Sequence, residues 1–323
     1  MSSENYEIDA VIAWVDSNDS QHLKKLNTYL PQGKKKNEGT LATRFRAVNE
    51  LEYCLRSLLK FAPFLRNIYI VTDTQTPNCV ADLKAEFQQA AKIKIVDHKE
   101  IFRDYESILP IFNSRSIASA VWRIKDLAEH FVYLNDDFFV LRNLSPEDWF
   151  IEGKPVVRGK WKSSPWIEEG IKSFKEKIRQ SSSKVNPTFK TLKWHGAKKA
   201  GFKYKYLDIY HTPHPMRKST IENYFKKAPG EFYENIKFRF RDFSQFSMVS
   251  FANHLEMSQG TAIVKSPQEV YMKPVNRSKN YIAKKTAIVQ NDSSKLFLCI
   301  QSLDSATKSD QATLIKWLKN YLA

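Results

Sequence analysis

The chain has 323 residues, of which 42% are hydrophobic, and its 51 Lys and Arg residues against 35 Asp and Glu give a formal net charge of +16. This apolar content excludes wholesale disorder and suits one large α/β unit or a core with a smaller subdomain. With 9 glycines and no repeat of fixed period, collagen-like and solenoid architectures are excluded. The three cysteines, Cys54, Cys79 and Cys299, lie far apart without a CxxC pair, so we expect a reducing compartment and neither a disulfide framework nor a structural zinc site.

The surplus of positive charge favours an anionic partner. No recognisable DNA- or RNA-binding motif accompanies the basic segments, so nucleic acid is not an expected partner. A solvated lysine-rich surface, a phosphate-bearing substrate and an anionic lipid leaflet each fit the charge. No apolar stretch reaches the ~18 residues that a transmembrane helix needs, and the N-terminus reads as neither a signal peptide nor an anchor. We therefore expect a cytoplasmic protein, with peripheral association at the membrane face through its positive charge.

Strands and helices alternate along the first half of the chain. A helix is predicted over 44–63, ended by Pro63, and another over 114–129, whereas the lysine-rich segment 20–43 reads as a surface excursion. Four β-rich apolar runs are predicted as buried strands: 8–15, 67–73, 92–98 and 131–141, the last interrupted at 135–137. This order indicates a doubly wound α/β sheet, whose ligands bind at the carboxyl edge of the strands. We expect the acidic residues that follow the strands to gather at that edge: Asp16, Asp73, Asp97, Asp136 and Asp137.

The composition divides the chain into three parts. Residues 1–150 form the α/β core, and residues 151–210, rich in Lys, Trp, Ser and Pro, are predicted as an inserted, lid-like subdomain with a helix near 167–180. Residues 211–323 complete the core with helices over 216–227, 243–257 and 310–322. The expected fold class is α/β, with a Rossmann-like doubly wound sheet and a helical or irregular insertion.

Asn135-Asp136-Asp137 lies between apolar, β-rich flanks. Two adjacent carboxylates at a strand end can hold a hard divalent cation, Mg²⁺ or Mn²⁺, and that cation can bridge a diphosphate. An acidic turn that caps the next element is the competing interpretation, although the flanks contain no Gly or Pro to make a turn.

His211 and His214 stand in one short segment, His211-Thr212-Pro213-His214-Pro215, that two prolines stiffen. A neutral histidine is a good general base for a hydroxyl nucleophile near pH 7. Metal binding is less suited, since two histidines with no nearby cysteine form an incomplete ligand set. The segment also fits a loop whose histidines only form hydrogen bonds.

Guanidinium groups that could bind phosphate oxygens are offered by four arginines: Arg44, Arg46, Arg239 and Arg241. The aromatic residues Trp14 and Tyr69, judged by their positions alone, are interpreted as core residues rather than as stacking platforms.

Taken together, these segments resemble the Stealth family of sugar-1-phosphate transferases. The first family block resembles residues 8–19, and the second resembles 44–77, 96–102, 109–117 and 130–140. Residues 211–219 and 237–247 resemble the third block, and 295–304 resembles the short fourth block loosely. The resemblance implies transfer of a hexose-1-phosphate from a UDP-sugar, such as a UDP-N-acetylhexosamine, to a sugar hydroxyl in capsular or surface polysaccharide synthesis. UMP would leave and a phosphodiester would form.

The resemblance also assigns roles to individual residues. His211, Arg239 and Asp137 match catalytic positions, and Asp136 with Asp137 would hold Mg²⁺ or Mn²⁺. Residues 1–150 would form the nucleotide-sugar-binding core. The nucleotide-sugar or phosphate would contact residues of this core and one residue of the third block: Trp14, Asp16, Asp19, Arg44, Arg46, Asn113 and His214. The resemblance further implies that the doubly wound sheet is GT-A-like, that residues 151–210 lie on the acceptor side, and that the protein associates peripherally with the inner membrane or capsule assembly machinery. One departure is Ala118, which stands where many family members carry Glu.

Two rival functions follow from the same residues. A metal-dependent glycosyltransferase on a similar sheet would attack the anomeric carbon and release UDP. A non-enzymatic polyanion-binding module would use the lysines alone, but the carboxylates expected at the sheet edge would repel its ligand. The expected acceptor is an oligosaccharide or polysaccharide, itself polyanionic if it contains phosphodiesters, which would give the basic surface a use.

Overall fold

A five-stranded sheet forms the centre of the computed structural model, which describes residues 6–30, 50–165 and 189–323. Its strand order is β3-β2-β1-β4-β9, and the first four strands are parallel. The strands are β1 (Ile8–Ala13), β2 (Ile68–Thr72), β3 (Ile93–Asp97), β4 (His130–Asn135) and the antiparallel edge strand β9 (His214–Arg217). β2 is buried along its whole length, as expected for a sheet covered on both faces. The predicted doubly wound α/β class is confirmed.

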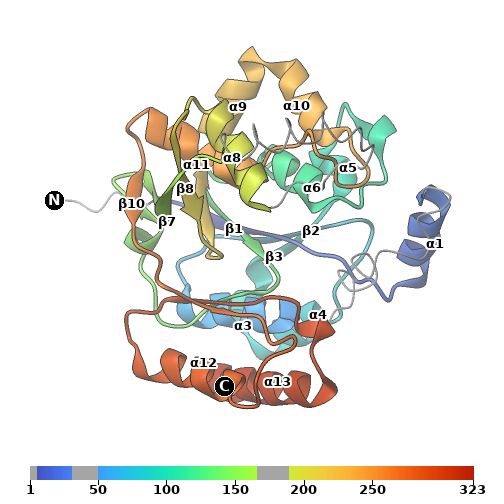
Figure 1. Cartoon of the computed structure of the whole chain (residues 1–323). Coiled ribbons are helices and arrows are strands. Elements are labelled where there is room, and N and C mark those ends of the chain that lie inside the picture. The colour runs from blue at the N-terminus through green and yellow to red at the C-terminus, as the bar shows by residue number, and fades with distance from the viewer. Residues whose placement is uncertain (1–5, 31–49, 166–188) are drawn as a thin grey trace, which may run out of the picture.

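Helices cover both faces of this sheet (Figure 1). One layer contains α3 (Glu50–Phe61), α4 (Cys79–Glu86), α12 (Tyr281–Asn291) and α13 (Lys308–Leu322). The opposite layer contains α5 (His98–Ile101), α6 (Ser114–Ala120), α9 (Lys218–Lys227), α10 (Pro229–Ile236) and α11 (Met248–Ser258). An apolar core lies on each face of the sheet, and successive residues of β1 point into opposite cores because side chains alternate along a strand. Ile12 packs in the core that contains α3, and Val11 in the core that contains α6 and α11.

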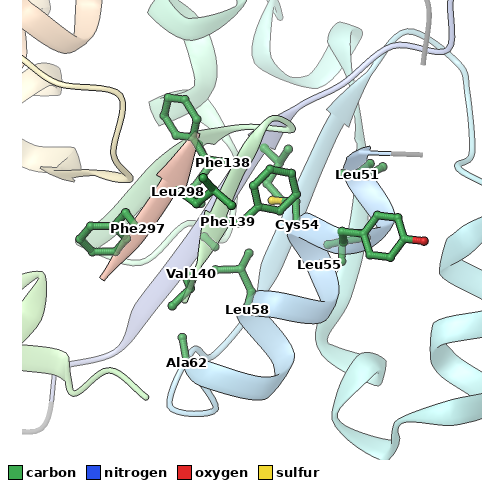
Figure 2. Close-up of a cluster of buried hydrophobic side chains, with 14 of the residues drawn as sticks. Leu51, Cys54, Leu55, Leu58, Ala62, Phe138, Phe139, Val140, Phe297 and Leu298 are labelled. Carbon is green, nitrogen blue, oxygen red and sulfur yellow. The ribbon is translucent and has the colours of Figure 1, made fainter. Parts of the chain in front are cut away.

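After β4 the chain leaves the central sheet. β5 (Phe138–Val140) pairs antiparallel with β12 (Phe297–Ile300), which runs parallel to β11 (Glu269–Met272). Figure 2 shows the apolar side chains of α3, among them Cys54, Leu55 and Leu58, gathered with those of β5 and β12. The predicted interruption of strand 131–141 is thus confirmed, and its two halves belong to different sheets.

The segment that follows residue 150 contains strands that the sequence did not predict. β6 (Phe150–Ile151) and β7 (Lys154–Ser163) form a hairpin whose turn residues, Glu152 and Gly153, both have positive φ, and β7 also pairs with β8 (Lys205–Ile209) and β10 (Ile263–Lys265). Helix α8 (Phe189–Lys199) precedes β8. The predicted helix at 167–180 lies outside the described residues.

Two predictions in the first half were wrong. The segment from Ser20 is helical, because α1 (Ser20–Tyr29) begins at Asp19, whose carboxylate accepts from the backbone N–H of His22. The helix predicted over 114–129 ends at Ala120 and continues only as a 3₁₀ turn. There Arg123 turns to donate to the Arg103 carbonyl and the Asp104 carboxylate.

All three cysteines are free thiols, as predicted. Among the described helices, none combines the length and the hydropathy required to cross a lipid bilayer.

Candidate active site

Asp136 and Asp137 occupy the turn where the chain passes from β4 to β5, at the carboxyl edge of the parallel strands. The backbone carbonyl of Asp137 accepts from the N–H of Ile300 at 3.1 Å, and its Oδ2 lies 3.8 Å from Sγ of Cys299. Its Oδ1 is buried and has no hydrogen-bond partner within the described part of the chain. The carboxylate is therefore held in place but left with unused acceptor capacity.

Carboxyl groups with raised pKa values accumulate at this turn. Burial raises the pKa of Asp136 to about 6, and burial together with Asp136 raises the pKa of Asp137 to about 8. Glu50, the first residue of α3, has a pKa well above its usual range because of burial and of the neighbouring charges of Asp136, Asp137 and Asp304. Four carboxyl groups from three distant parts of the sequence thus meet here.

These side chains fit a hard divalent cation. An orphaned carboxylate oxygen and like charges that raise one another's pKa are what an oxygen-ligated cation would relieve. Within residues 6–30, 50–165 and 189–323, no three His, Cys, Asp or Glu side chains already form a ligand set. The donor chemistry therefore fits Mg²⁺, whereas a complete shell would need water or substrate oxygens as well.

Glu50 and Asp304 were not singled out from the sequence. Each is a lone acidic residue, but Glu50 lies within the segment that resembles the second Stealth block, and Asp304 ends the segment that resembles the fourth. Closer attention to acidic residues inside those blocks would have found them. Neither residue can be placed beside Asp137 without the fold.

The histidine segment lies beside the carboxylate turn. His214 begins β9 and is paired with Tyr133 of β4, because β9 runs antiparallel along the edge of β4. The ring of Phe138, the first residue of β5, meets both histidines edge-on, with centroid distances of 6.3 Å to His211 and 5.8 Å to His214. The structure thus brings together the two motifs, some 75 residues apart in the sequence.

Both histidines are neutral at pH 7. Burial and the charge of Lys193 lower the pKa of His211 to about 4, and Asp208 opposes this effect. Burial, His211 and Lys193 lower the pKa of His214 to about 3. Each ring can therefore accept a proton, although in the free protein the basicity of each is weak.

Further polar residues surround His211. Its ring lies 5.1 Å from that of Tyr271 on β11, whose hydroxyl donates to Gln301. Burial raises the pKa of Glu269 to about 7, against the opposing effects of Lys193 and of a hydrogen bond from the His211 backbone. Tyr271 and Glu269 were missed because β11 is short and its residues resemble no motif.

The arginines of segment 237–241 occupy different environments. The guanidinium of Arg239 lies 4.4 Å from the ring centroid of Tyr29 on α1 and donates to the Leu109 carbonyl at 3.1 Å. Arg241 donates to Ser114 Oγ at 2.8 Å, and its charge acts on the Tyr133 hydroxyl together with Asp136 and Asp137. Arg241, rather than Arg239, is thus the arginine whose charge acts on Tyr133, near the carboxylate turn. Arg44 and Arg46 lie outside the described residues.

Asn113 holds this arginine segment in place. Its side chain is fully buried, and its amide group lies within hydrogen-bond distance of the carbonyls of Phe238 and Phe240 and of Gln245 Oε1. Its own side-chain oxygen accepts from the N–H of Arg115 at the start of α6. The geometry gives Asn113 a positioning role, whereas its predicted contact with a ligand stays a prediction.

The residues of the first block lie at the same sheet edge, beyond β1. Trp14 is half-buried against the main core, and the fully buried position predicted for Tyr69 is observed. Asp16 exchanges two backbone hydrogen bonds with the side chain of Gln75, both at 2.9 Å, and Asp19 caps α1. These contacts fix the loop after β1, but the predicted binding roles of its residues stay predictions.

Asp73 and Asp97 form a second acidic group farther along the edge, after β2 and β3. Lys25 of α1 forms a 3.0 Å ion pair with Asp73, and Asp97 Oδ2 accepts from the N–H of Thr74 at 2.8 Å. Burial lowers the pKa of the adjacent His98 to about 4. The predicted acidic residues thus follow the strands at the common edge. Lys25 neutralises part of the charge of the Asp73 and Asp97 group, whereas only carboxyl groups gather around Asp136 and Asp137.

Comparison with known proteins gives the family. The model described as "Stealth protein CR2, conserved region 2" matches residues 44–157, which include all four segments that resemble the second block. An exopolysaccharide phosphotransferase of Lactiplantibacillus plantarum is 30% identical over 261 residues, which are 75% of this chain and 73% of that protein. A capsular polysaccharide phosphotransferase of Neisseria meningitidis serogroup B is 32% identical over 76% of this chain and 63% of its own.

Other similar proteins are longer or more distant. An exopolysaccharide phosphotransferase of Streptomyces coelicolor is 32% identical over 79% of this chain, but the matched part spans 26% of its length. Among solved structures, the galactosyltransferase LgtC in complex with donor and acceptor sugar analogues aligns over 97% of this chain and 95% of its own, with 11% identity and a TM-score of 0.47. The sequence relatives are named as phosphotransferases, which are transferase enzymes. On these matches, the chain belongs to the Stealth protein family.

Proposed function

We propose that this protein transfers a hexose-1-phosphate from a UDP-sugar to a sugar hydroxyl, and so forms a phosphodiester in the synthesis of a capsular or surface polysaccharide. The observation that carries the proposal is the meeting of Asp136 and Asp137 with His211 at the carboxyl edge of the parallel sheet. The names of the Stealth relatives support phosphoryl transfer as the reaction class.

The carboxyl groups would hold a divalent cation. Asp136 and Asp137 would bind Mg²⁺ or Mn²⁺, with Glu50 and Asp304 close enough to act on their pKa values. Bound there, the cation would neutralise negative charge on the diphosphate of the donor.

His211 would act as the general base. Its ring is neutral at pH 7 and accepts the proton of the acceptor hydroxyl as that oxygen attacks the β-phosphorus of the donor. A new phosphorus–oxygen bond forms to the acceptor, and the bond from the β-phosphorus to the bridging oxygen breaks, so that UMP departs with the electron pair. The negative donor beside His211 would raise its low pKa and strengthen it as a base.

The two arginines would serve different parts of the reaction. Arg241, whose charge reaches Tyr133, is suited to stabilise charge on the phosphoryl oxygens near the carboxylate turn. Arg239 is held against Tyr29, so its predicted catalytic role requires the donor to extend toward α1.

The nucleotide product tests the proposal. The purified protein is incubated with Mg²⁺, a panel of UDP-sugars and a pool of acceptor oligosaccharides, and the released nucleotide is identified by chromatography. UMP together with a new phosphodiester is the expected product pair. Release of UDP would instead establish attack at the anomeric carbon and would refute transfer at phosphorus.

A further inference from the structure

An exposed surface on β7 and β8 combines aromatic rings with lysines. Lys160, Trp161 and Lys162 lie near the end of β7, and Lys203 and Tyr204 precede Lys205, the first residue of β8, so each triplet has an aromatic residue between two lysines. Because side chains alternate along a strand, Trp161 and Lys205 lie on one face of the ribbon and Lys160 and Lys162 on the other. All six residues are exposed; Trp161 is 44% and Tyr204 76% accessible. We call these six residues the KWK/KYK surface. An exposed aromatic ring beside lysines can stack on a flat apolar face of a ligand while the ammonium groups bind its anionic groups.

The strand pairing holds the two triplets side by side. Ser163 is paired with Lys205 and Lys162 with Tyr206, while the N–H of Ser164 donates to the Tyr204 carbonyl at 2.8 Å. The ammonium group of Lys205 lies 4.9 Å from the ring centroid of Trp161. The indole therefore stands next to a fixed positive charge on the same face of the ribbon.

The two described segments that carry this surface are basic. Residues 154–163 and 189–207 contain ten Lys and Arg residues and no Asp or Glu. Asp208, just beyond, is engaged by Lys162 at 2.5 Å and by Lys193 at 2.7 Å. A ligand that fits here carries repeated negative charge and flat apolar faces.

Two ion pairs and a charge effect connect Lys162 of this surface to His211 of the candidate active site. Lys162 contacts Asp208, Asp208 contacts Lys193, and the charges of Asp208 and Lys193 both act on His211. The N–H of Tyr210, which precedes His211, donates to the Arg158 carbonyl of β7 at 3.1 Å. In Figure 1, β7 and β8 flank the central sheet on the side opposite α1.

We propose that the KWK/KYK surface binds the growing acceptor, a glycan chain that bears phosphodiesters, and leads its end toward His211. This inference rests on the proposed function for the identity of the chain. The C–H groups of a pyranose face meet the negative face of an indole or phenol ring, and the lysines neutralise the phosphates between sugars. A phosphodiester-linked glycan offers both features in alternation.

Binding is measured without donor, by calorimetry, with three probes: phosphomannan, uncharged mannan and inorganic polyphosphate. The wild-type protein is expected to bind phosphomannan more tightly than the other two. Trp161→Ala and Tyr204→Ala should each weaken phosphomannan binding roughly tenfold, the order of one lost aromatic contact, and leave polyphosphate binding nearly unchanged. Trp161→Phe keeps a ring and should keep most of the affinity.

Matched substitutions separate this surface from general effects. Lys203→Ala with Lys205→Ala should weaken binding of both anionic probes and reduce its dependence on salt, because two phosphate contacts are lost. Lys316→Ala with Lys319→Ala removes two exposed charges from α13 in the opposite layer, and should change neither affinity.

Three results would overturn the proposal. One is an unchanged affinity for phosphomannan in both Trp161→Ala and Tyr204→Ala. Another is an equal loss of phosphomannan affinity in the Lys203/Lys205 double variant and in the Lys316/Lys319 double variant. The third concerns membranes: if Trp161→Ala abolishes binding to phosphatidylglycerol vesicles but leaves phosphomannan binding unchanged, the surface binds a membrane rather than a glycan.

The hydrolysis of the donor by water, which releases UMP slowly, serves as a control. Its rate, measured in the same variants, should equal that of the wild type. Absence of UMP with intact glycan binding would refute the proposed reaction and leave the surface assignment standing.

Discussion

Replacing Asp137 by Asn tests whether the carboxylate turn is built for a cation. In the folded protein, burial and Asp136 raise the pKa of Asp137 from 3.8 to about 8. The folded protein therefore binds a proton more tightly than the unfolded chain does. The resulting cost to stability is absent below pH 4, grows as the pH rises, and is complete above pH 8.

The size of this cost follows from the two pKa values. At about 1.36 kcal/mol for each pKa unit, the raised pKa of Asp137 lowers the free energy of unfolding at pH 7 by roughly 4 kcal/mol as an upper bound, because the folded protein retains a proton that the unfolded chain releases. Asp137 is not wholly inaccessible, and water and side chains relax around it, so we expect about 1–3 kcal/mol. Asn cannot ionise and keeps nearly the same shape. Asp137→Asn should thus make the metal-free protein more stable by this amount.

Urea unfolding at pH 5 and pH 8, with EDTA or with Mg²⁺, measures the effect. In EDTA, Asp137→Asn should raise the free energy of unfolding more at pH 8 than at pH 5. Addition of Mg²⁺ should stabilise the wild type, more strongly at pH 8, and the variant little, because binding requires the ionised carboxylate. Asp126→Asn, at an exposed position, serves as the control and should change neither quantity.

The reasoning fails if Asp137→Asn is less stable than the wild type at pH 8 in EDTA, since the carboxylate would then be stabilising without a cation. It also fails if Mg²⁺ stabilises the variant and the wild type equally.

Three other substitutions probe the site and its support. His211→Ala should lower the rate of UMP release roughly 10²–10⁴-fold with little change in melting temperature, and full activity would exclude it as the base. Asn113→Ala should cost about 2–3 kcal/mol in urea unfolding and also slow UMP release, because the segment that carries Arg241 loses its buried anchor; loss of stability with unchanged turnover would contradict the positioning role. Glu256→Ala should cost roughly 3 kcal/mol in the same unfolding assay, because this buried carboxylate accepts from Arg217 and from two threonines; an effect below 1 kcal/mol would show the network to be dispensable.

The central sheet could be predicted because its strands are buried on both faces. Runs such as residues 8–13 and 68–72 are mainly apolar and rich in β-branched residues, which indicates buried strands. Helix α3 was equally clear from its apolar spacing. Helix α1 was missed because its surface is mainly polar and its signal is the cap at Asp19 rather than a periodic apolar face.

Strands β7 and β8 were missed for a different reason. The second half of β7 is exposed and alternates lysine with other residues, so its composition resembles that of a loop. Pairing with β8, more than 40 residues later, makes it a strand. Local propensity carries no information about such a partner.

The site was only partly predictable for the same reason. Asp136, Asp137 and His211 belong to short motifs that suggest chemistry on their own. Glu50 and Asp304 do not, since each becomes significant only through the long-range contacts that place α3 and the end of β12 beside the carboxylate turn. A search for motifs considers residues that are close in the sequence, so it does not find a charged cluster whose members come singly from distant segments.

The carboxylates converge because the apolar core beneath them outweighs their repulsion. Asp136 and Asp137 are the two residues between two sheets, and each neighbouring strand is fixed by its own ladder. Phe138, Phe139 and Leu298 are at most 1% exposed and pack with α3 in the same cluster (Figure 2). Burial of each such side chain contributes about 1.5–3 kcal/mol, so three of them exceed the few kcal/mol by which the raised pKa of Asp137 opposes folding. Hydrophobic packing, rather than ion pairing, therefore holds the charged turn in the geometry that a cation and a phosphorylated donor would use.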